Sequence, residues 1–152
     1  MTEATTTLGV ADIQRIMACI PHRYPFLLVD RVVEINGDES GVGIKNVTIN
    51  EPQFTGHFPE RPVFPGVLMI EAMAQTAGVL VVNARGSEDT AVRSVLFTTI
   101  DKAKFRKPVG PGDTLRFHLT KVARKRNIYF YRGEARVDGA LVAEADLSAM
   151  VV

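Results

Sequence analysis

Apolar and polar positions recur with two different periods along this chain of 152 residues. From Val10 to Ile20 apolar residues fall three to four positions apart, which predicts a short amphipathic helix that Pro21 ends. Between residues 67 and 83 the chain is apolar nearly all round, which predicts a long buried helix rather than a surface helix. Most of the chain that follows is rich in β-branched and aromatic residues, which is typical of strands.

Six stretches are predicted as strands. Asn36-Gly37 and Asp138-Gly139 are the clearest hairpin signals between them. The predicted strands span residues 26–35, 41–49 (with a possible break near Lys45-Asn46), 92–100, 114–122, 128–137 and 140–152. A single long helix buried against an antiparallel sheet is an α+β architecture. We expect one domain over residues 1–152, with residues 1–8 frayed.

A proline-rich loop, residues 51–65, precedes the long helix. Its four prolines exclude a long helix or a central strand, and each of them stiffens the backbone. A stiff loop suits a side chain that must be held in one place, and His57 is the candidate. Its imidazole has the titration range of a general base near neutral pH. The alternative is a histidine that only makes a structural hydrogen bond.

The long helix carries two polar residues that its apolar character does not explain. Glu71 is expensive to bury unless it is paired or used, and burial would raise its pKa so that it could donate a proton. Gln75 lies one turn later on the same face and could orient Glu71 or bind a substrate. The alternative for Glu71 is a structural carboxylate satisfied by a backbone amide or an arginine.

The start of the helix is a candidate anion site. Pro65 suits a first helical turn because its missing N–H is not needed there. The free N–H groups of Gly66 and Val67 would then point out of the helix, where the helix dipole adds positive potential. A carbonyl oxygen placed there would be polarised, as in an oxyanion hole, and Gly66 has no side chain to keep a ligand away.

These groups together suggest a reaction. A base, an acid and a carbonyl-polarising site fit removal of a proton alpha to a carbonyl with loss of a beta group, which is a dehydration. The three histidines and the single Cys19 show no zinc-ligand spacing, and phosphate-binding and nucleophile-elbow motifs are absent, so we expect no metal and no cofactor. The spacing does not guarantee that His57 meets Glu71 within one chain. If a second subunit also covers the long helix, the pair could be completed across a twofold interface, and this helix would then be the element that makes the dimer.

Charge changes this picture in one respect. The net charge of +1 argues for neither a nucleic-acid nor a membrane partner, yet residues 93–136 hold twelve Lys and Arg against three Asp and Glu. This excess is either a solvated edge or a docking face for an acidic partner. The N-terminus lacks the basic and apolar regions of a signal peptide, and polar residues interrupt the longest apolar segment, so we expect a cytoplasmic protein.

Four segments resemble one family. GHFPERPVFPGVLMIEAMAQ (56–75), HRYPFLLVDRV (22–32), TIDKAKFRKPVGPGD (99–113) and VDGALVAEADL (137–147) are similar to the FabZ-type 3-hydroxyacyl-(acyl-carrier-protein) dehydratases. The resemblance implies a hot-dog fold, in which a curved antiparallel sheet wraps a long central helix. It also implies homodimers with joined sheets, usually assembled as trimers of dimers, that act on (3R)-3-hydroxyacyl chains carried by acyl carrier protein and yield trans-2-enoyl thioesters.

The resemblance also implies residue roles. His57 of one subunit and Glu71 of the other would form the catalytic pair, as base and acid, and Gly66 would bind the thioester carbonyl. An acyl tunnel would be lined by Phe58, Val63, Met69, Leu96 and Phe97, with His22 near its mouth. The acidic carrier would dock on Lys102, Lys104, Arg106, Lys107, Arg124, Lys125 and Arg126.

Three positions refine the expectation. The related FabA-type dehydratase/isomerases have an aspartate in place of Glu71 and a cysteine in place of Gly56, so both residues here favour the non-isomerising type. Leu96 stands where some relatives have a tyrosine that gates the tunnel, which puts a tyrosine gate in doubt. Two other functions stay open: a hot-dog acyl thioesterase, and a non-catalytic module that binds acyl carrier protein.

Overall fold

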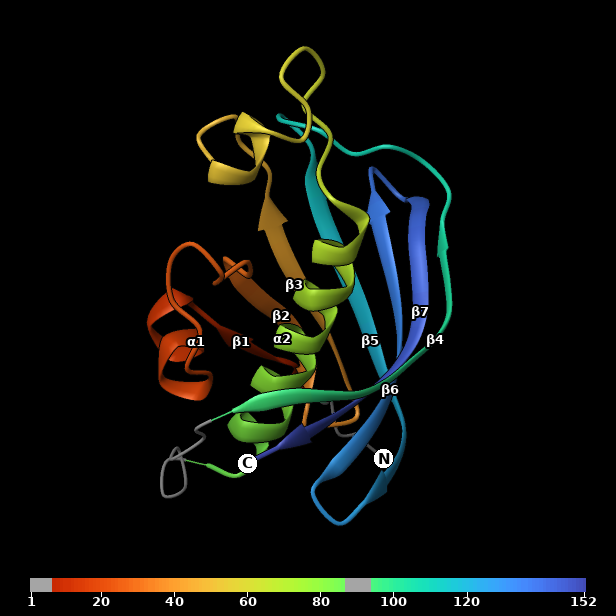
Figure 1. Cartoon of the computed structure of the whole chain (residues 1–152). Coiled ribbons are helices and arrows are strands. Elements are labelled where there is room, and N and C mark those ends of the chain that lie inside the picture. Colours follow the sequence, from red (N-terminus) through yellow and green to blue (C-terminus); the bar gives the residue numbers. More distant parts are fainter. Residues whose placement is uncertain (1–6, 87–93) are drawn as a thin grey trace, which may run out of the picture.

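A seven-stranded antiparallel sheet wraps around one long helix in the computed structural model, which describes residues 7–86 and 94–152. The strand order is β1-β2-β3-β5-β6-β7-β4, and the sheet curves around α2 (Figure 1). The short helix α1 lies beside α2 at the β1 end of the sheet. This is the hot-dog architecture that the resemblance implies, with seven strands in the described chain instead of about six.

The elements follow the predicted order. The helices are α1 (Ile13–Cys19) and α2 (Gly66–Ala84), with a 3₁₀ helix at Pro52–Thr55. The strands are β1 (Gly9–Ala11), β2 (Arg31–Asn36), β3 (Ser40–Asn46), β4 (Val95–Phe105), β5 (Thr114–Lys125), β6 (Ile128–Val137) and β7 (Ala140–Val151).

Both predicted hairpins and the buried helix are confirmed. Asn36 and Gly37 turn β2 into β3, and Asp138 and Gly139 turn β6 into β7 with φ of 49° and 81°. In α2, 13 of 19 residues are buried, so the sheet covers this helix on most sides. By length and mean hydropathy (1.6) α2 is also long and apolar enough to span a membrane, but 72% of that window is buried inside the protein, as in a core helix.

The N-terminal prediction is wrong in detail. Residues 9–11 form β1, which pairs with β2, and the helix begins only at Ile13. The reason is Asp12, whose carboxylate accepts the Arg15 N–H at 2.9 Å and caps the helix there. Of the eight residues expected to fray, 1–6 lie outside the described residues, and Thr7 and Leu8 lead into β1.

The strand predicted from residue 26 begins only at Arg31. Its first residues find other hydrogen-bond partners, because the Phe26 and Leu27 N–H groups both donate to the Arg23 carbonyl. The Leu28 N–H donates to the Gln75 side chain at 2.9 Å. A turn and a helix side chain therefore replace the sheet as partners of this backbone.

Other strand ends also differ from prediction. β3 ends at Asn46, where a break was expected, and β4 runs to Phe105, five residues beyond its predicted end. β4 can continue because β7 pairs with it as far as Ala143, with a bulge between Asp101 and Lys104. β4 is an edge strand, opposite β1, and ten of its eleven residues are exposed. Its predicted start at residue 92 lies outside the described residues.

The helix packs very close to the sheet at Gly43. A Cβ on Gly43 would lie 2.1 Å from Oγ1 of Thr76, so α2 could not approach β3 this closely with any other residue there. Thr76 itself is fully buried and donates its hydroxyl to the Ala72 carbonyl at 2.8 Å. This contact fixes the depth of α2 in the sheet, and with it the positions of Glu71 and Gln75.

Candidate active site

His57 is held by a hydrogen bond within its own loop. Its Nδ1 lies 2.7 Å from the Val63 carbonyl oxygen, and the Val63 N–H donates to the His57 carbonyl at 3.0 Å. A carbonyl only accepts, so Nδ1 carries the proton and a neutral imidazole presents the lone pair of Nε2. The ring stacks on Phe58 with centroids 4.1 Å apart. The geometry therefore fixes both the tautomer and the direction of a base.

Gln75 connects Glu71 to the segment after α1. It is fully buried, and its Nε2 donates to the Phe26 carbonyl at 2.7 Å and to Glu71 Oε2 at 3.1 Å, while its Oε1 accepts from Leu28. Burial raises the pKa of Glu71, against the smaller opposing effect of the Gln75 hydrogen bond. The direction of this shift is the one expected for a carboxyl buried on an apolar helix.

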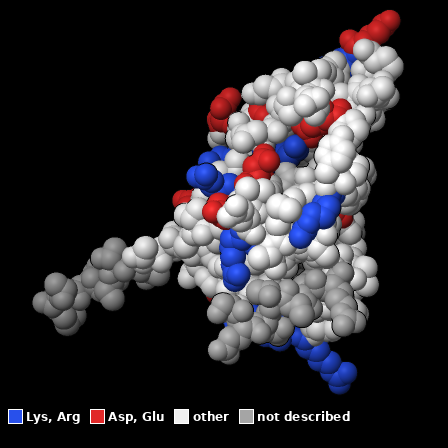
Figure 2. Space-filling view, turned by 90° about the vertical axis from the view of Figure 1, so that its left-hand side faces the viewer, with Lys and Arg blue, Asp and Glu red and all other residues white. Residues whose placement is uncertain are grey.

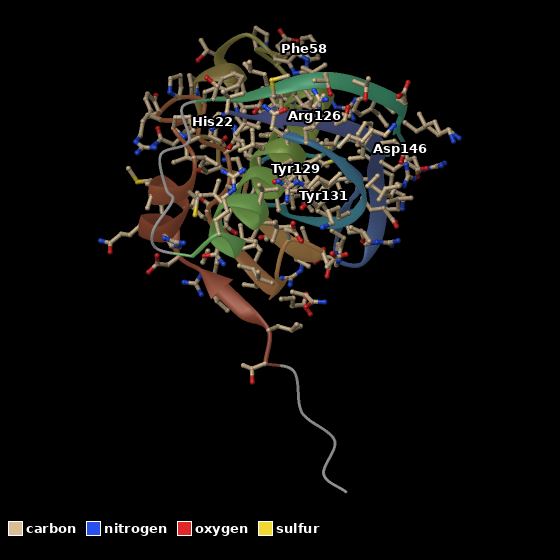
Figure 3. All side chains as sticks on the ribbon, turned by 90° about the horizontal axis from the view of Figure 1, so that it is seen from below. His22, Phe58, Arg126, Tyr129, Tyr131 and Asp146 are labelled. Carbon is tan, nitrogen blue, oxygen red and sulfur yellow. The ribbon has the colours of Figure 1, made fainter. Side chains whose placement is uncertain are left out.

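His22 lies next to Glu71. Its Nε2 is 3.7 Å from Glu71 Oε2, and Figure 3 shows it on the α1 side of the molecule, away from Asp146 on the sheet. Burial, with a contribution from the Arg23 guanidinium, lowers the pKa of His22. The resemblance places His22 only near the mouth of a tunnel, so its contact with the acid is new information.

The first turn of α2 leaves two donors free among the described residues. Leu68 and Met69 donate to the Pro65 carbonyl, whereas the N–H groups of Gly66 and Val67 have no partner in the described chain. Phe105 packs directly on Gly66, where a Cβ would lie 2.7 Å from the ring. The glycine is therefore needed to let Phe105 and the helix start share this space.

An apolar cavity of about 410 Å³ lies against these two N–H groups. Its walls come from the loop before α2, the first turns of α2, and the end of β4 with the residues after it: Val63, Phe64, Gly66, Val67, Met69, Phe105, Arg106, Lys107 and Pro108. The Phe64 N–H donates to the Val109 carbonyl at 2.7 Å, which ties the two loops together. The cavity adjoins Val63, whose carbonyl holds His57, so the candidate base and the candidate carbonyl site belong to one segment.

Within one chain the predicted tunnel residues do not come together. Val63 and Met69 line the cavity, whereas His22 contacts Glu71 and Phe58 is half exposed on the His57 ring. Leu96 and Phe97 lie on β4, where 54% and 37% of their surfaces are exposed. Among the described residues no hydrogen bond or ion pair joins His57 to Glu71. A single chain thus holds the parts of the site without joining them.

The sequence reasoning missed two supporting contacts. Lys45 and Glu51 form an ion pair of 2.8 Å with both side chains about nine-tenths buried, and Glu51 Oε2 accepts the Thr48 N–H. Lys45 also lies 6.0 Å from the centroid of the Phe64 ring. This pair anchors the loop that carries His57. A lysine at a strand end followed six residues later by a glutamate gives no sequence signal for it.

Phe105 was also missed, because it lies beyond the strand predicted to end at residue 100 and no local signal marks its ring as part of a site.

The seven basic residues expected to bind the carrier are all exposed, but they form two groups. Lys104 pairs with Glu144, whereas Lys125 pairs with Ile128, which in turn pairs with Met150. Six positions along β7 thus separate Lys104 from the level of Lys125, ~20 Å of extended chain.

Comparison with known proteins decides the family. The sequence profile of the FabA-like domain matches residues 20–146. The chain belongs to this family, in its FabZ branch. A protein of Methylobacterium radiotolerans named 3-hydroxyacyl-[acyl-carrier-protein] dehydratase FabZ is 62% identical over 99% of this chain and 95% of its own length. Its namesakes in Methylobacterium nodulans and Sinorhizobium medicae are 60% and 58% identical over the whole chain, covering 96% and 97% of their own lengths.

Solved structures support the fold. A dehydratase heterocomplex, ApeI:P from Xenorhabdus doucetiae, superposes with a TM-score of 0.73 at 17% identity, covering 90% of both chains. Cj0977 of Campylobacter jejuni superposes with a TM-score of 0.63 at 14% identity, covering 93% of this chain and 90% of that one. At such identities the likeness concerns the fold alone. Among the described residues no cluster of three or more metal-ligating side chains occurs.

Proposed function

We propose that this FabZ-type chain dehydrates (3R)-3-hydroxyacyl chains on acyl carrier protein to trans-2-enoyl chains in fatty acid biosynthesis. Full-length relatives at about 60% identity carry the name of this activity. The observation that best supports it in the molecule is the continuity of residues 57–67, where a fixed imidazole, an apolar cavity and two free N–H groups adjoin.

His57 is the proposed base. With Nδ1 donating to Val63, Nε2 is free to take the C2 proton of the substrate. The two electrons of the C2–H bond become the C2=C3 double bond, while the C3–O bond breaks. Glu71 is the proposed acid and gives its proton to the departing oxygen, which leaves as water. Burial suits Glu71 to this role because it raises the pKa of the carboxyl.

The N–H groups of Gly66 and Val67 are the proposed binding site for the thioester oxygen. Negative charge develops on this oxygen as the C2 proton leaves, and the start of α2 offers fixed donors and the positive end of the helix dipole. The cavity beside them would hold carbons of the substrate next to Val63 and Met69.

We infer that the site is completed by a second subunit. The acid and the base are not joined within the chain, and β4 is an edge strand that exposes Leu96, Phe97, Ile100 and Phe105. Such a strand is a ready partner for a second sheet. Pairing there would bring Leu96 and Phe97 to a shared tunnel and would give two sites per dimer. Three such dimers would form the hexamer that the resemblance implies. Since α2 is largely covered by its own sheet, β4 is the better candidate for the contact than α2.

Carrier docking is proposed on the basic group beside the cavity. Lys102, Lys104, Arg106 and Lys107 are exposed, and the last two border the cavity. Arg124, Lys125 and Arg126 lie at the other end of the same chain's sheet, so they would contact the same carrier only across a subunit interface. On the face seen in Figure 2 acidic and basic side chains are interspersed, so this face shows no single basic patch.

The test is turnover of the purified protein. We expect enoyl absorbance to appear from 3-hydroxyacyl carrier thioesters and to disappear when crotonyl thioester is supplied in reverse. Release of free thiol without enoyl product would instead identify a thioesterase. Tight binding of acyl carrier protein with neither reaction would identify a binding module.

A further inference from the structure

We propose that His22 is a positioning residue for Glu71: it holds Oε2 of the carboxyl and so leaves Oε1 to carry the proton for the leaving hydroxyl. The inference rests on the proposed dehydration, because it assigns a partner to the acid of that reaction. It concerns a residue that the resemblance mentions only as part of a tunnel mouth.

Two side chains face the same oxygen of Glu71. Gln75 Nε2 donates to Oε2 at 3.1 Å, and His22 Nε2 lies 3.7 Å from the same atom. Among the described residues no hydrogen bond reaches Oε1. Because Oε2 accepts from one side chain and faces a second, a proton on the carboxyl belongs on Oε1. The two oxygens thus have different tasks.

The backbone around His22 is fixed on both sides. The Arg23 guanidinium donates to the carbonyls of Met17, Ile20 and His22 itself, at 2.9, 3.0 and 2.6 Å, which closes the end of α1. Four residues further on, Gln75 holds the Phe26 carbonyl. The main chain that carries the imidazole is therefore held in place on both sides.

The contacts of the His22 ring point to no other role. His22 Nδ1 is buried and has no hydrogen-bond partner in the described part of the chain, and the side chain is only 13% exposed. A buried nitrogen without a partner is costly, so a packing role alone would be better filled by an apolar ring. The other ring nitrogen, Nε2, faces the carboxyl of Glu71.

A neutral imidazole is the right partner for an acid that must stay protonated. The charged or titratable groups facing His22 are Arg23 and Glu71, and burial together with Arg23 disfavours a charge on the ring. A cation in this place would stabilise the carboxylate and lower the pKa of Glu71. The present distance exceeds a hydrogen bond by roughly 0.7 Å, a gap of the kind that closes when substrate binds.

Four variants test the idea. His22→Phe removes the donor and should lower kcat on the order of tenfold to a hundredfold with KM little changed. His22→Gln keeps a neutral donor and should recover most of that loss. His22→Lys supplies a cation and should move the alkaline limb of the kcat/KM profile to lower pH. His118→Phe is the matched control, because His118 is also a partly buried imidazole but lies on β5, where Glu34 and Glu134 are its acidic neighbours.

A second readout does not depend on turnover. Carbon-13 NMR of glutamate-labelled protein, with the Glu71 signal assigned by its loss in Glu71→Gln, gives the pKa of Glu71 without substrate. His22→Lys should lower it, while His118→Phe should leave it unchanged. Wild-type kcat in His22→Phe, or an unchanged Glu71 titration in His22→Lys, would overturn the proposal. One outcome separates the two proposals. If the wild-type protein turned over no hydroxyacyl thioester while His22→Lys still lowered the pKa of Glu71, the proposed function would be wrong, whereas the contact between His22 and Glu71 would be supported. If His22→Phe does not fold, the Gln and Lys variants decide.

Discussion

Phe105 packs its ring against Gly66, so that a Cβ on the glycine would meet the ring at 2.7 Å. The two residues are 39 positions apart, at the end of β4 and the start of α2. Their contact forms one wall of the cavity and keeps the free N–H groups of the helix start open to it.

Gly66→Ala should therefore damage the carbonyl site. Overpacking of a tight contact costs ~1–3 kcal/mol, and the same displacement at the site would lower kcat/KM roughly tenfold to a hundredfold. Gly56→Ala is the matched control, because a Cβ there meets nothing within 4 Å. Steady-state kinetics of both variants checks this, and equal activity of the two would contradict the role of Gly66.

His57→Ala and Glu71→Gln should each lower kcat by at least ~10²–10⁴-fold with the fold retained. A mixture of the two inactive proteins should regain part of the activity, because some mixed dimers hold one site with both an intact His57 and an intact Glu71. The measurement is turnover after subunit exchange, with exchange followed independently by mass spectrometry. Complete exchange with no recovery would exclude a site shared between subunits.

Charge reversal should separate the two basic groups. Lys104→Glu with Arg106→Glu should raise KM for carrier-linked substrate far more than for a short thioester, because only the carrier reaches the rim of the cavity. The matched pair Arg124→Glu with Arg126→Glu changes the charge equally at the far end of the sheet. This second double variant should raise KM for the carrier-linked substrate less. The measurement is the ratio of KM for the carrier-linked substrate to KM for the short thioester, compared between the two double variants.

Glu144 should make the protein more stable as pH rises from about 2 to 4.5. Hydrogen bonds from Arg106 and Arg132, at 2.9 and 2.8 Å, lower its pKa from 4.5 to about 2. Between these pH values the unfolded state binds more protons than the folded state. The stabilisation from Glu144 is therefore complete above the pKa of its carboxyl in the unfolded state, and it is lost as the pH falls through the lower pKa in the folded state.

Unfolding by urea at several pH values tests this. Glu144→Gln should flatten the rise in the free energy of unfolding between these pH values. Glu34→Gln removes the same charge from a half-exposed carboxylate 3.9 Å from Arg116, and it should change the slope much less. Identical slopes in wild type and Glu144→Gln would rule out the assignment.

Gln75→Leu should destabilise the fold although Leu has nearly the same size. It leaves the buried Leu28 N–H without its acceptor, which by itself costs roughly 1–3 kcal/mol. Gln14→Leu makes the same change on the exposed side of α1 and should be nearly neutral. Chemical denaturation of both variants gives the comparison. A Gln75→Leu protein as stable as wild type would mean that the hydrogen bonds of Gln75 contribute little to the free energy of unfolding.

Local sequence signals were enough to predict the secondary-structure elements and the residue types of the candidate site. Periodicity located α2 within one residue at each end, and turn residues located both hairpins, because these signals act over a few neighbouring positions. The motif around His57 and Glu71 indicated the family, and the comparisons confirm that family.

Which of these groups meet depends on the packing between the elements. Asp12 caps α1, so that the helix begins at Ile13. The Gln75 side chain, and not a neighbouring strand, accepts the Leu28 N–H. The same fold placed His22 against Glu71 and Phe105 against Gly66. These contacts join residues that lie tens of positions apart, and they depend on how deeply α2 sits in the curved sheet, which Gly43 sets through Thr76. A local pattern carries no information about such distances, because packing between elements decides them.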